Sequence, residues 1–164
     1  MYVKTIYQSP LGPMSLVTSD KGLRGAWFED QKFFERGLDE KPVLGSHPIL
    51  NSTSLLLDAY FSGEQVDFSS LTLEAIGTEF QEKVWALLKE IPHGQTTSYG
   101  HLARQLGQRS GQAIGGAVGR NPYSIIVPCH RVLNQKGQLT GYAGGLDKKI
   151  WLLIHENPNF EVKK

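Results

Sequence analysis

The chain has 164 residues, 40% of them hydrophobic and 20% charged, with a formal net charge of +1. These values are typical of a globular protein with one core or two small ones, and they exclude a mainly disordered chain. One cysteine excludes an internal disulfide, no apolar stretch approaches the roughly 18 residues of a membrane span, and no secretion signal is recognisable at the N-terminus. We therefore expect an intracellular protein, cytoplasmic or, in a eukaryote, nuclear.

Charge is divided unevenly along the chain. Residues 1–76 carry 6 Lys and Arg against 10 Asp and Glu, a net −4, whereas residues 77–164 carry 11 against 6, a net +5. A positive half attracts polyanions, nucleic acid first, although an ordinary solvated surface gives the same excess.

The first third of the sequence predicts a small antiparallel sheet covered by one helix. Short β-rich runs separated by turn residues predict three strands, at 2–7, 14–18 and 23–28. Apolar residues at helical spacing between Ile49 and Phe61 predict a helix that covers one face of the sheet and stops at Ser62. We interpret residues 1–76 as a structural subdomain, with a linker over 68–77.

The second half begins with helical signals. Thr78 to Gln81 matches a capping box, and the apolar stripe that follows ends at Pro92. Two short helices, 98–106 and 110–118, then flank a break at 107–109, which indicates a helix-turn-helix.

The second of these short helices is rich in glycine. Its glycines at 111, 115 and 116 leave a surface without side chains, and each costs a helix roughly 1 kcal/mol relative to alanine. Such a surface allows another backbone to approach closely, either a DNA duplex or a second helix.

The only cysteine, Cys129, follows a β-branched run at 125–127, which we expect to be a buried strand, and Pro128. A free thiol has a pKa near ~8.5 and becomes a nucleophile when a base or a positive charge lies beside it. His130 and Arg131 supply one of each. A buried, unreactive thiol is the alternative for an isolated cysteine.

A cysteine nucleophile also needs groups that orient its base. Glu156, Asn121 and Tyr99 are polar side chains on neighbouring predicted elements. Adjacent strand residues point to opposite faces, so Cys129 and His130 converge only if Pro128 turns the chain.

These motifs together resemble one known family. The matching segments are Thr97-Ser98-Tyr99, Asn121-Pro122, Pro128-Cys129-His130-Arg131-Val132, Tyr142-Ala143-Gly144-Gly145, Trp151-Leu152-Leu153 and His155-Glu156. They are similar to those of the O6-alkylguanine-DNA alkyltransferases, also called methylated-DNA–protein-cysteine methyltransferases. The resemblance is almost continuous over residues 77–156 and looser before them.

The resemblance implies a suicide repair reaction. An O6-alkylated guanine, or an O4-alkylated thymine, is flipped from duplex DNA, and its alkyl group moves irreversibly to Cys129. In the family pattern, His130 takes the thiol proton through a water, Glu156 orients His130, and Asn121 orders the network. Tyr99 helps rotate the nucleotide and donates a proton to the leaving guanine.

The resemblance also implies a set of DNA contacts. The Val132 carbonyl and the backbone near Tyr142 and Ala143 read the base edge. Gln112 occupies the position where the family usually inserts an arginine into the vacated base stack. Either Gln112 intercalates there more weakly, or Arg109 or Arg120 takes over the role. The remaining expected contacts to DNA come from Gly115, Arg120 and Arg131.

The sequence thus predicts an α/β (α+β) protein: an N-terminal antiparallel sheet-plus-helix subdomain, 1–76, and a C-terminal mostly helical domain, 77–164, with a helix-turn-helix. We expect double-stranded DNA as partner, no cofactor and no metal, and a monomer of which several copies can bind along one duplex. Two alternatives remain. A cysteine hydrolase would use Cys129, His130 and Glu156 for many turnovers, and a non-catalytic module would only bind damaged DNA, as alkyltransferase-like proteins without the cysteine do.

Overall fold

The computed structural model describes residues 1–107 and 111–163. The chain divides into two compact units, residues 1–76 with 122–126, and residues 77–121 with 127–164. The five residues 122–126 therefore lie in the first unit, whereas the sequence analysis placed them in the second domain.

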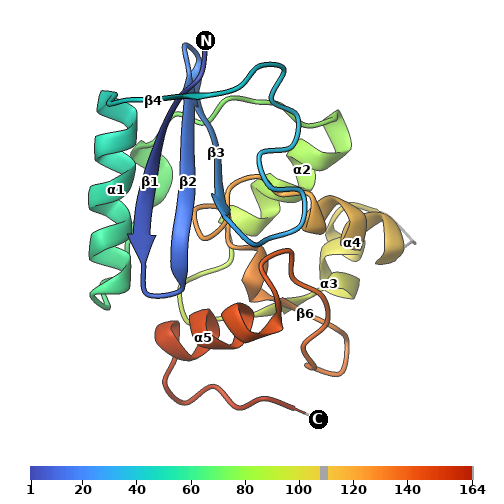
Figure 1. Ribbon diagram of the computed structural model, residues 1–164. Coiled ribbons are helices and arrows are strands. Elements are labelled where there is room, and N and C mark those ends of the chain that lie inside the picture. Colours follow the sequence, from blue (N-terminus) through green and yellow to red (C-terminus); the bar gives the residue numbers. More distant parts are fainter. Residues whose placement is uncertain (108–110, 164) are drawn as a thin grey trace. The chain divides into compact units, whose positions relative to one another are not determined.

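The first unit contains a four-stranded sheet in the order β3-β2-β1-β4 (Figure 1). Its strands are β1 (Val3–Ser9), β2 (Gly12–Ser19), β3 (Gly22–Phe28) and β4 (Val43–Leu44). The three long strands pair antiparallel as predicted, and the two-residue β4 adds a parallel edge beside β1. The sheet is therefore mixed.

Helix α1 (Pro48–Phe61) packs on this sheet and buries Leu50, Thr53, Leu57 and Tyr60. It begins where the His47 side chain accepts a hydrogen bond from the Ile49 amide, at 3.1 Å, and Pro48 fits the first turn because it needs no amide donor. It ends at Ser62, before a left-handed Gly63. The predicted helix is confirmed.

The predicted linker at 68–77 is instead part of the first unit's structure. After a 3-10 turn, η1 (Phe68–Ser70), the chain runs along β3, where the Leu23 amide donates to Thr72 O at 2.8 Å and the Glu74 amide donates to Leu23 O at 2.9 Å. A Cβ on Gly22 would lie 2.6 Å from Thr72 O, so this close approach requires glycine.

The predicted strand at 125–127 is wrong. The segment is buried, but it forms a turn in which Ile125 has a φ of 72°, a conformation that strains a β-branched residue. Prolines at 122 and 128 flank the turn. Two backbone hydrogen bonds with Ala26, at 2.8 and 3.0 Å, attach residues 122–126 to the end of β3.

The second unit is mostly helical, with a short parallel strand pair. Its elements are α2 (Glu79–Lys89), β5 (Thr97–Ser98), α3 (Tyr99–Gln105), α4 (Gly111–Gly119), η2 (Cys129–Arg131), β6 (Val132–Leu133) and α5 (Leu146–Glu156). The capping box at the start of α2 is confirmed. Helix α4 packs against α2 and α3, and Trp85 Nε1 donates to the Ala117 carbonyl at 2.8 Å. The two helices of the predicted helix-turn-helix are thus present, although residues 108–110 between them lie outside the described residues.

Helix α5 buries a different face from the one its apolar pattern suggests. Leu146 and Ile154 are 45% and 42% exposed. The buried residues are Lys149, Leu152, Leu153 and Glu156. Two charged side chains, Lys149 and Glu156, therefore lie on the inward face of the helix, about two turns apart.

Tyr123 holds residues 122–126 in the first unit. Its hydroxyl lies 3.0 Å from Leu23 O and 2.6 Å from Glu74 O. We expect Tyr123→Phe to lower the free energy of unfolding by about 1–2 kcal/mol, because the hydroxyl's hydrogen bonding to the Leu23 and Glu74 carbonyls is lost. Tyr7→Phe is the matched control: its exposed hydroxyl bonds Asp58, and we expect a change within about 0.5 kcal/mol. Urea denaturation of both variants measures the difference, and equal losses would contradict it.

Candidate active site

Cys129 is presented by a tight turn. Pro128 has φ −80° and ψ 66°, and the Cys129 amide donates to Val127 O at 2.8 Å, which together define an inverse γ-turn. One turn of 3-10 helix then carries Cys129, His130 and Arg131, and all three side chains are buried. Pro128 thus provides the change of direction that the sequence analysis required.

A buried ionic cluster lies next to the cysteine. His130 Nε2 is 2.6 Å from Glu156 Oε2. Arg131 Nε donates to Glu156 Oε1 at 2.7 Å, and its Nη2 donates to Oε2 at 3.0 Å. His130 Nδ1 is buried and has no hydrogen-bond partner among the described residues. Since a carboxylate accepts hydrogen bonds, we place the neutral imidazole proton on Nε2, which leaves the lone pair on Nδ1.

The cluster fixes the charge of both groups. Burial lowers the pKa of His130, although the Glu156 carboxylate opposes this shift, so the imidazole is neutral at neutral pH. For Glu156, burial favours the neutral form, but His130 and Arg131 together outweigh it and hold the pKa of the carboxyl well below its usual range. Glu156 is therefore a buried anion, paired on both oxygens.

Two groups favour the thiolate form of Cys129. Burial raises the pKa of the thiol, whereas a hydrogen bond from the Asn121 side chain and the charge of Lys149 lower it. Asn121 is itself held in place because its Nδ2 donates to Val127 O at 2.7 Å. The resting residue is a thiol that can be ionised when a base removes its proton.

Lys149 is a residue of this site that the sequence analysis missed. Its side chain is fully buried, and its ammonium lies 2.7, 2.9 and 3.2 Å from the carbonyls of Val132, Thr140 and Gly141. Burial lowers the pKa of Lys149 to about 8, while the neighbouring Cys129 acts in the opposite direction. Its spacing from Glu156, seven residues along α5, is the sequence signal that places both on one face.

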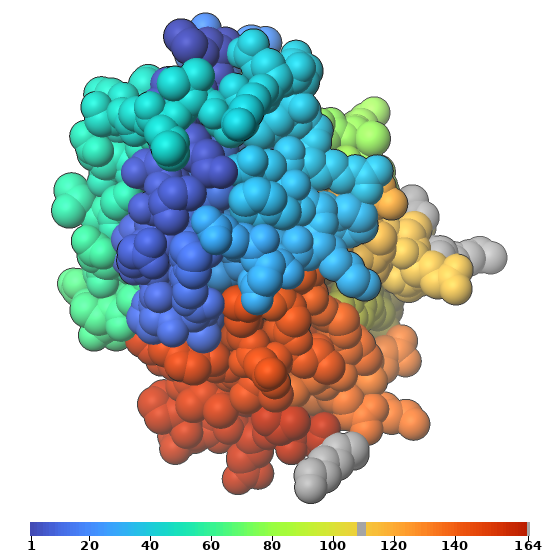
Figure 2. All heavy atoms as spheres, viewed as in Figure 1, coloured from blue at the N-terminus to red at the C-terminus, as the bar shows by residue number. Residues whose placement is uncertain are grey.

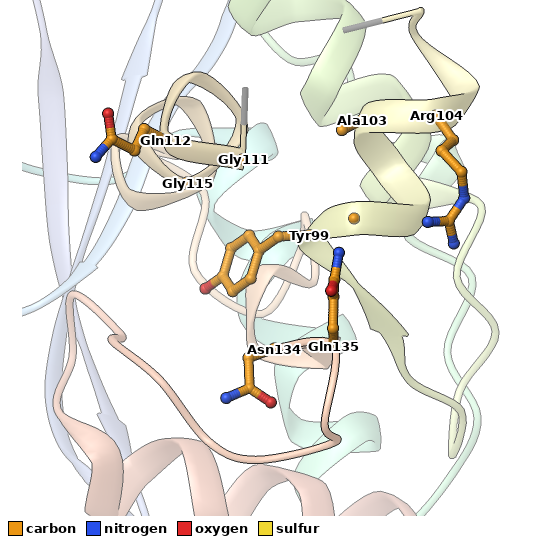
Figure 3. Close-up of a pocket in the computed structure, with 9 residues that line it drawn as sticks. Tyr99, Ala103, Arg104, Gly111, Gln112, Gly115, Asn134 and Gln135 are labelled. Atoms are coloured by element: carbon orange, nitrogen blue, oxygen red, sulfur yellow. The ribbon is translucent and has the colours of Figure 1, made fainter. Parts of the chain in front are cut away.

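A groove of about 780 Å³ lies beside α3 and α4 (Figure 3). Its lining residues include Tyr99, Gln112, Gly115, Asn134 and Gln135. The Tyr99 ring stands between α4 and the turn that carries Asn134 and Gln135 (Figure 3). Burial raises the pKa of the Tyr99 hydroxyl, so this group keeps its proton at neutral pH and can donate it.

The glycines of α4 face open space. A Cβ built at any of its four glycines, Gly111, Gly115, Gly116 or Gly119, would meet no described atom within 4 Å outside the local helix. The helix residues lie at the surface in the space-filling view (Figure 2). Close packing of a second helix among the described residues therefore does not explain these glycines, which removes one of the two alternatives.

The other residues predicted to contact DNA differ in whether their side chains are exposed. Arg131 does not lie at an exposed surface: Nε and Nη2 bond Glu156, and Nη1 donates to Ile91 O at 2.7 Å, so the structure contradicts its assignment as a DNA contact. Gln112 and Arg120 are exposed on or just after α4. Arg109 lies outside the described residues.

The remaining predicted residues line the region near the cysteine. The Val132 carbonyl accepts from Lys149, and Tyr142 and Ala143 are half-buried in the loop before α5. Over residues 1–107 and 111–163, no group of His, Cys, Asp or Glu side chains is arranged to hold a metal ion. Within the same ranges, no helix has the length and apolarity needed to cross a membrane.

Comparisons with known proteins match both halves of the chain. Residues 79–158 match the model of the 6-O-methylguanine DNA methyltransferase DNA-binding domain, and residues 2–75 match that of the ribonuclease-like domain of the same proteins. The methylated-DNA–protein-cysteine methyltransferase of Methanosarcina acetivorans is 40% identical over 90% of this chain and 94% of its own length. The chain belongs to the methylated-DNA–protein-cysteine methyltransferase family.

Other methylated-DNA–protein-cysteine methyltransferases and their structures agree with this assignment. The Mycobacterium leprae enzyme is 43% identical over 88% of this chain and 86% of its own length. The crystal structure of Mycobacterium tuberculosis O6-methylguanine methyltransferase is 36% identical, with a TM-score of 0.82 over 99% of this chain and 97% of that one. A DNA complex of the M. tuberculosis protein gives a TM-score of 0.77 at 36% identity, over 94% and 92% of the two chains. The predicted family and the α+β fold are confirmed, and the protein is an enzyme of the transferase class.

Lys149 provides a test of the electrostatics around the nucleophile. We expect Lys149→Met to slow the reaction of Cys129 with iodoacetamide about tenfold near pH ~7, because loss of the charge raises the pKa of the thiol. Lys148→Met is the matched control, since Lys148 bonds Gly144 O instead. Mass spectrometry of the folded proteins gives both rates, and equal rates in the two variants would contradict this view of Lys149.

Proposed function

We propose that the protein repairs duplex DNA by transferring alkyl groups from O6 of guanine to Cys129, once per molecule. The observation that carries this proposal is the buried Cys129 beside a His130–Glu156 pair whose Nδ1 is unoccupied, in a chain of the methylated-DNA–protein-cysteine methyltransferase family. O4-alkylthymine is a second substrate of the same chemistry, because it also carries its alkyl group on a ring-bound oxygen.

The proton path begins at the thiol. His130 Nδ1 accepts the Cys129 proton through an intervening water, and Glu156 stabilises the imidazolium that forms, in the manner of a nucleophile–base–acid triad. The hydrogen bond from Asn121 and the positive charge of Lys149 stabilise the negative charge on the sulfur. The base is therefore built into the protein.

Transfer is an in-line displacement. The thiolate attacks the alkyl carbon, a C–S bond forms, the C–O bond breaks, and its electron pair stays on guanine. Tyr99, whose hydroxyl is protonated at neutral pH, donates a proton to the departing guanine. The thioether product has no good leaving group, so water does not regenerate the thiol and the protein acts once.

The substrate base must leave the duplex to react. Cys129 is 6% exposed, and a stacked base cannot place its O-alkyl carbon in line with a buried sulfur. The exposed Gln112, on the wall of the groove, fills the vacated stack, with Arg120 as the alternative. The Val132 carbonyl and the backbone of Tyr142 and Ala143 bind the flipped base.

Helix α4 is the surface we assign to the duplex. Its glycine face is open, and the charge of residues 77–164 is +5, which favours a polyanion. The similar M. tuberculosis protein has been crystallised with DNA. We propose double-stranded DNA as the partner, bound by a monomer, with several copies able to occupy one duplex.

The nucleophile is tested by stoichiometry. After incubation with excess duplex containing O6-methylguanine, intact-mass spectrometry should show one added methyl group, and peptide mapping should place it on Cys129. Cys129→Ser should lose transfer while keeping duplex binding, because the exposed α4 surface is unchanged.

Each of the other outcomes would indicate a different function or a different nucleophile. Product far exceeding the protein would indicate the cysteine hydrolase. Binding without a mass change would indicate the damage-binding module. Transfer that survives in Cys129→Ser would overturn the assignment of the nucleophile.

Gly115 tests the DNA-facing surface. Gly115→Ala should stabilise the protein by roughly 0.5–1 kcal/mol, since nothing obstructs its Cβ and alanine favours a helix. Gly115→Leu should be about as stable as Gly115→Ala. It should bind duplex DNA at least about tenfold more weakly than the wild type, a loss of about 1.4 kcal/mol of binding free energy, because its larger side chain holds the DNA away. Urea denaturation and fluorescence anisotropy measure the two effects, and wild-type affinity in the leucine variant would remove α4 from the interface.

A further inference from the structure

The Arg131 guanidinium is part of the active-site cluster without touching the nucleophile's base. It bonds both oxygens of Glu156 and the Ile91 carbonyl just beyond the end of α2, and its side chain is 11% exposed. The reaction proposed above assigns roles to Glu156 and His130 but none to this residue.

The geometry makes Arg131 a rigid support for Glu156. Its planar fork makes two near-parallel bonds to the carboxylate, at 2.7 and 3.0 Å, and so fixes the plane of that group. Oε2 is then directed at His130 Nε2, 2.6 Å away. A single charged contact would leave the carboxylate free to rotate about its last bond, whereas two bonds do not.

The charges of the cluster lead to the same conclusion. Arg131 is positive, Glu156 negative and His130 neutral, so the three buried groups carry no net charge before the reaction. A carboxylate neutralised by a guanidinium is a poorer proton acceptor than a lone one, so the proton stays on His130 Nε2. The Nδ1 lone pair is then available to the thiol proton.

We propose that Arg131 is a positioning residue for alkyl transfer: by holding Glu156 fixed and ionised, it keeps His130 neutral and its Nδ1 ready to accept the thiol proton. This inference rests on the proposed function, in which His130 is the base. Arg131 acts only through Glu156 and His130.

Other charged groups face the cluster and must stay constant in a test. Besides Glu156 and Arg131, the charge of Lys149 on α5 acts on His130. His93, beyond the end of α2, lies close enough to Glu156, Arg131 and His155 for their charges to act on it. Lys149, His93, His155 and Glu156 are unaltered in the Arg131 variants below.

The test is the pH dependence of single-turnover methyl transfer from an O6-methylguanine duplex. Burial, and to a lesser degree the Arg131 charge, lower the pKa of His130, so the rate of the wild type should fall only at low pH. In Arg131→Met the pKa of His130 should rise, so the decline of the rate at low pH, the acidic limb of the profile, should shift to higher pH by about one unit. The rate near pH ~6 should then fall about tenfold more than the rate near pH ~9.

Arg131→Lys separates charge from geometry. Lysine keeps the positive charge but cannot make the two parallel bonds, so its acidic limb should stay near that of the wild type while the rate falls at every pH. A purely structural role for Arg131 predicts equal losses at all pH values in both variants, with no movement of the limb. An unmoved limb in a folded Arg131→Met protein would overturn the proposal.

A measurement on the wild type covers the case in which Arg131→Met does not fold. Histidine labelled with ¹⁵N, with the His130 signals assigned through a His130→Gln variant, should show a neutral ring near pH ~7 that is protonated on Nε2 and not on Nδ1. A charged ring or the opposite tautomer would overturn the proposal. Absence of transfer by the wild type would instead overturn the proposed function, so the two failures are distinguishable.

Discussion

The Glu156 carboxylate occupies a position in which a negative charge is unfavourable unless it is paired. It lies at the carboxyl end of α5, where the helix dipole opposes an anion, and its side chain is 1% exposed. Arg131 and His130 together compensate for both effects. Because Arg131 also bonds the Ile91 carbonyl, one ion pair joins the end of α2, the turn that carries Cys129 and the end of α5. The position of the nucleophile in the second unit therefore depends on the Arg131–Glu156 charge pair, which our proposal also uses in the reaction.

The same burial that makes the ion pair strong makes the thiol weakly acidic. In our proposal Cys129 attacks from a buried position, and the same burial raises its pKa. The Asn121 hydrogen bond and the Lys149 charge oppose this rise in the thiol pKa. Lys149 also joins the Val132 carbonyl to the loop at Thr140 and Gly141, so one ammonium supports both the sulfur and the backbone beside it.

Local patterns in the sequence predicted the parts of the fold that local forces determine. The three long strands, the capping box of α2 and the turn at Pro128 follow from residue types within a few positions of each other. Long-range partners were not predictable in this way. The pairing of Arg131 with Glu156, 25 residues away, and the burial of Lys149 on the inward face of α5 depend on such contacts. The β-branched run at 125–127 predicted a strand, but the prolines on either side and the left-handed Ile125 make it a turn. Buried charge inverts the usual hydrophobic pattern, which is why the pattern of α5 does not reveal Lys149 and Glu156 as inward-facing residues.

Helix α4 shows how a sequence with weak helix propensity remains helical. Its inward residues, Ile114, Ala117 and Val118, are buried, and Trp85 bonds the Ala117 carbonyl, so packing rather than propensity holds the helix. The outer face is thereby free to be almost bare backbone. Gln112 on this face adds no charge, so in our proposal it contributes to stacking in the duplex but not to counterion release. Affinity for DNA then depends on close approach and on basic residues elsewhere in the second half of the chain, and the sulfur chemistry at Cys129 is independent of both.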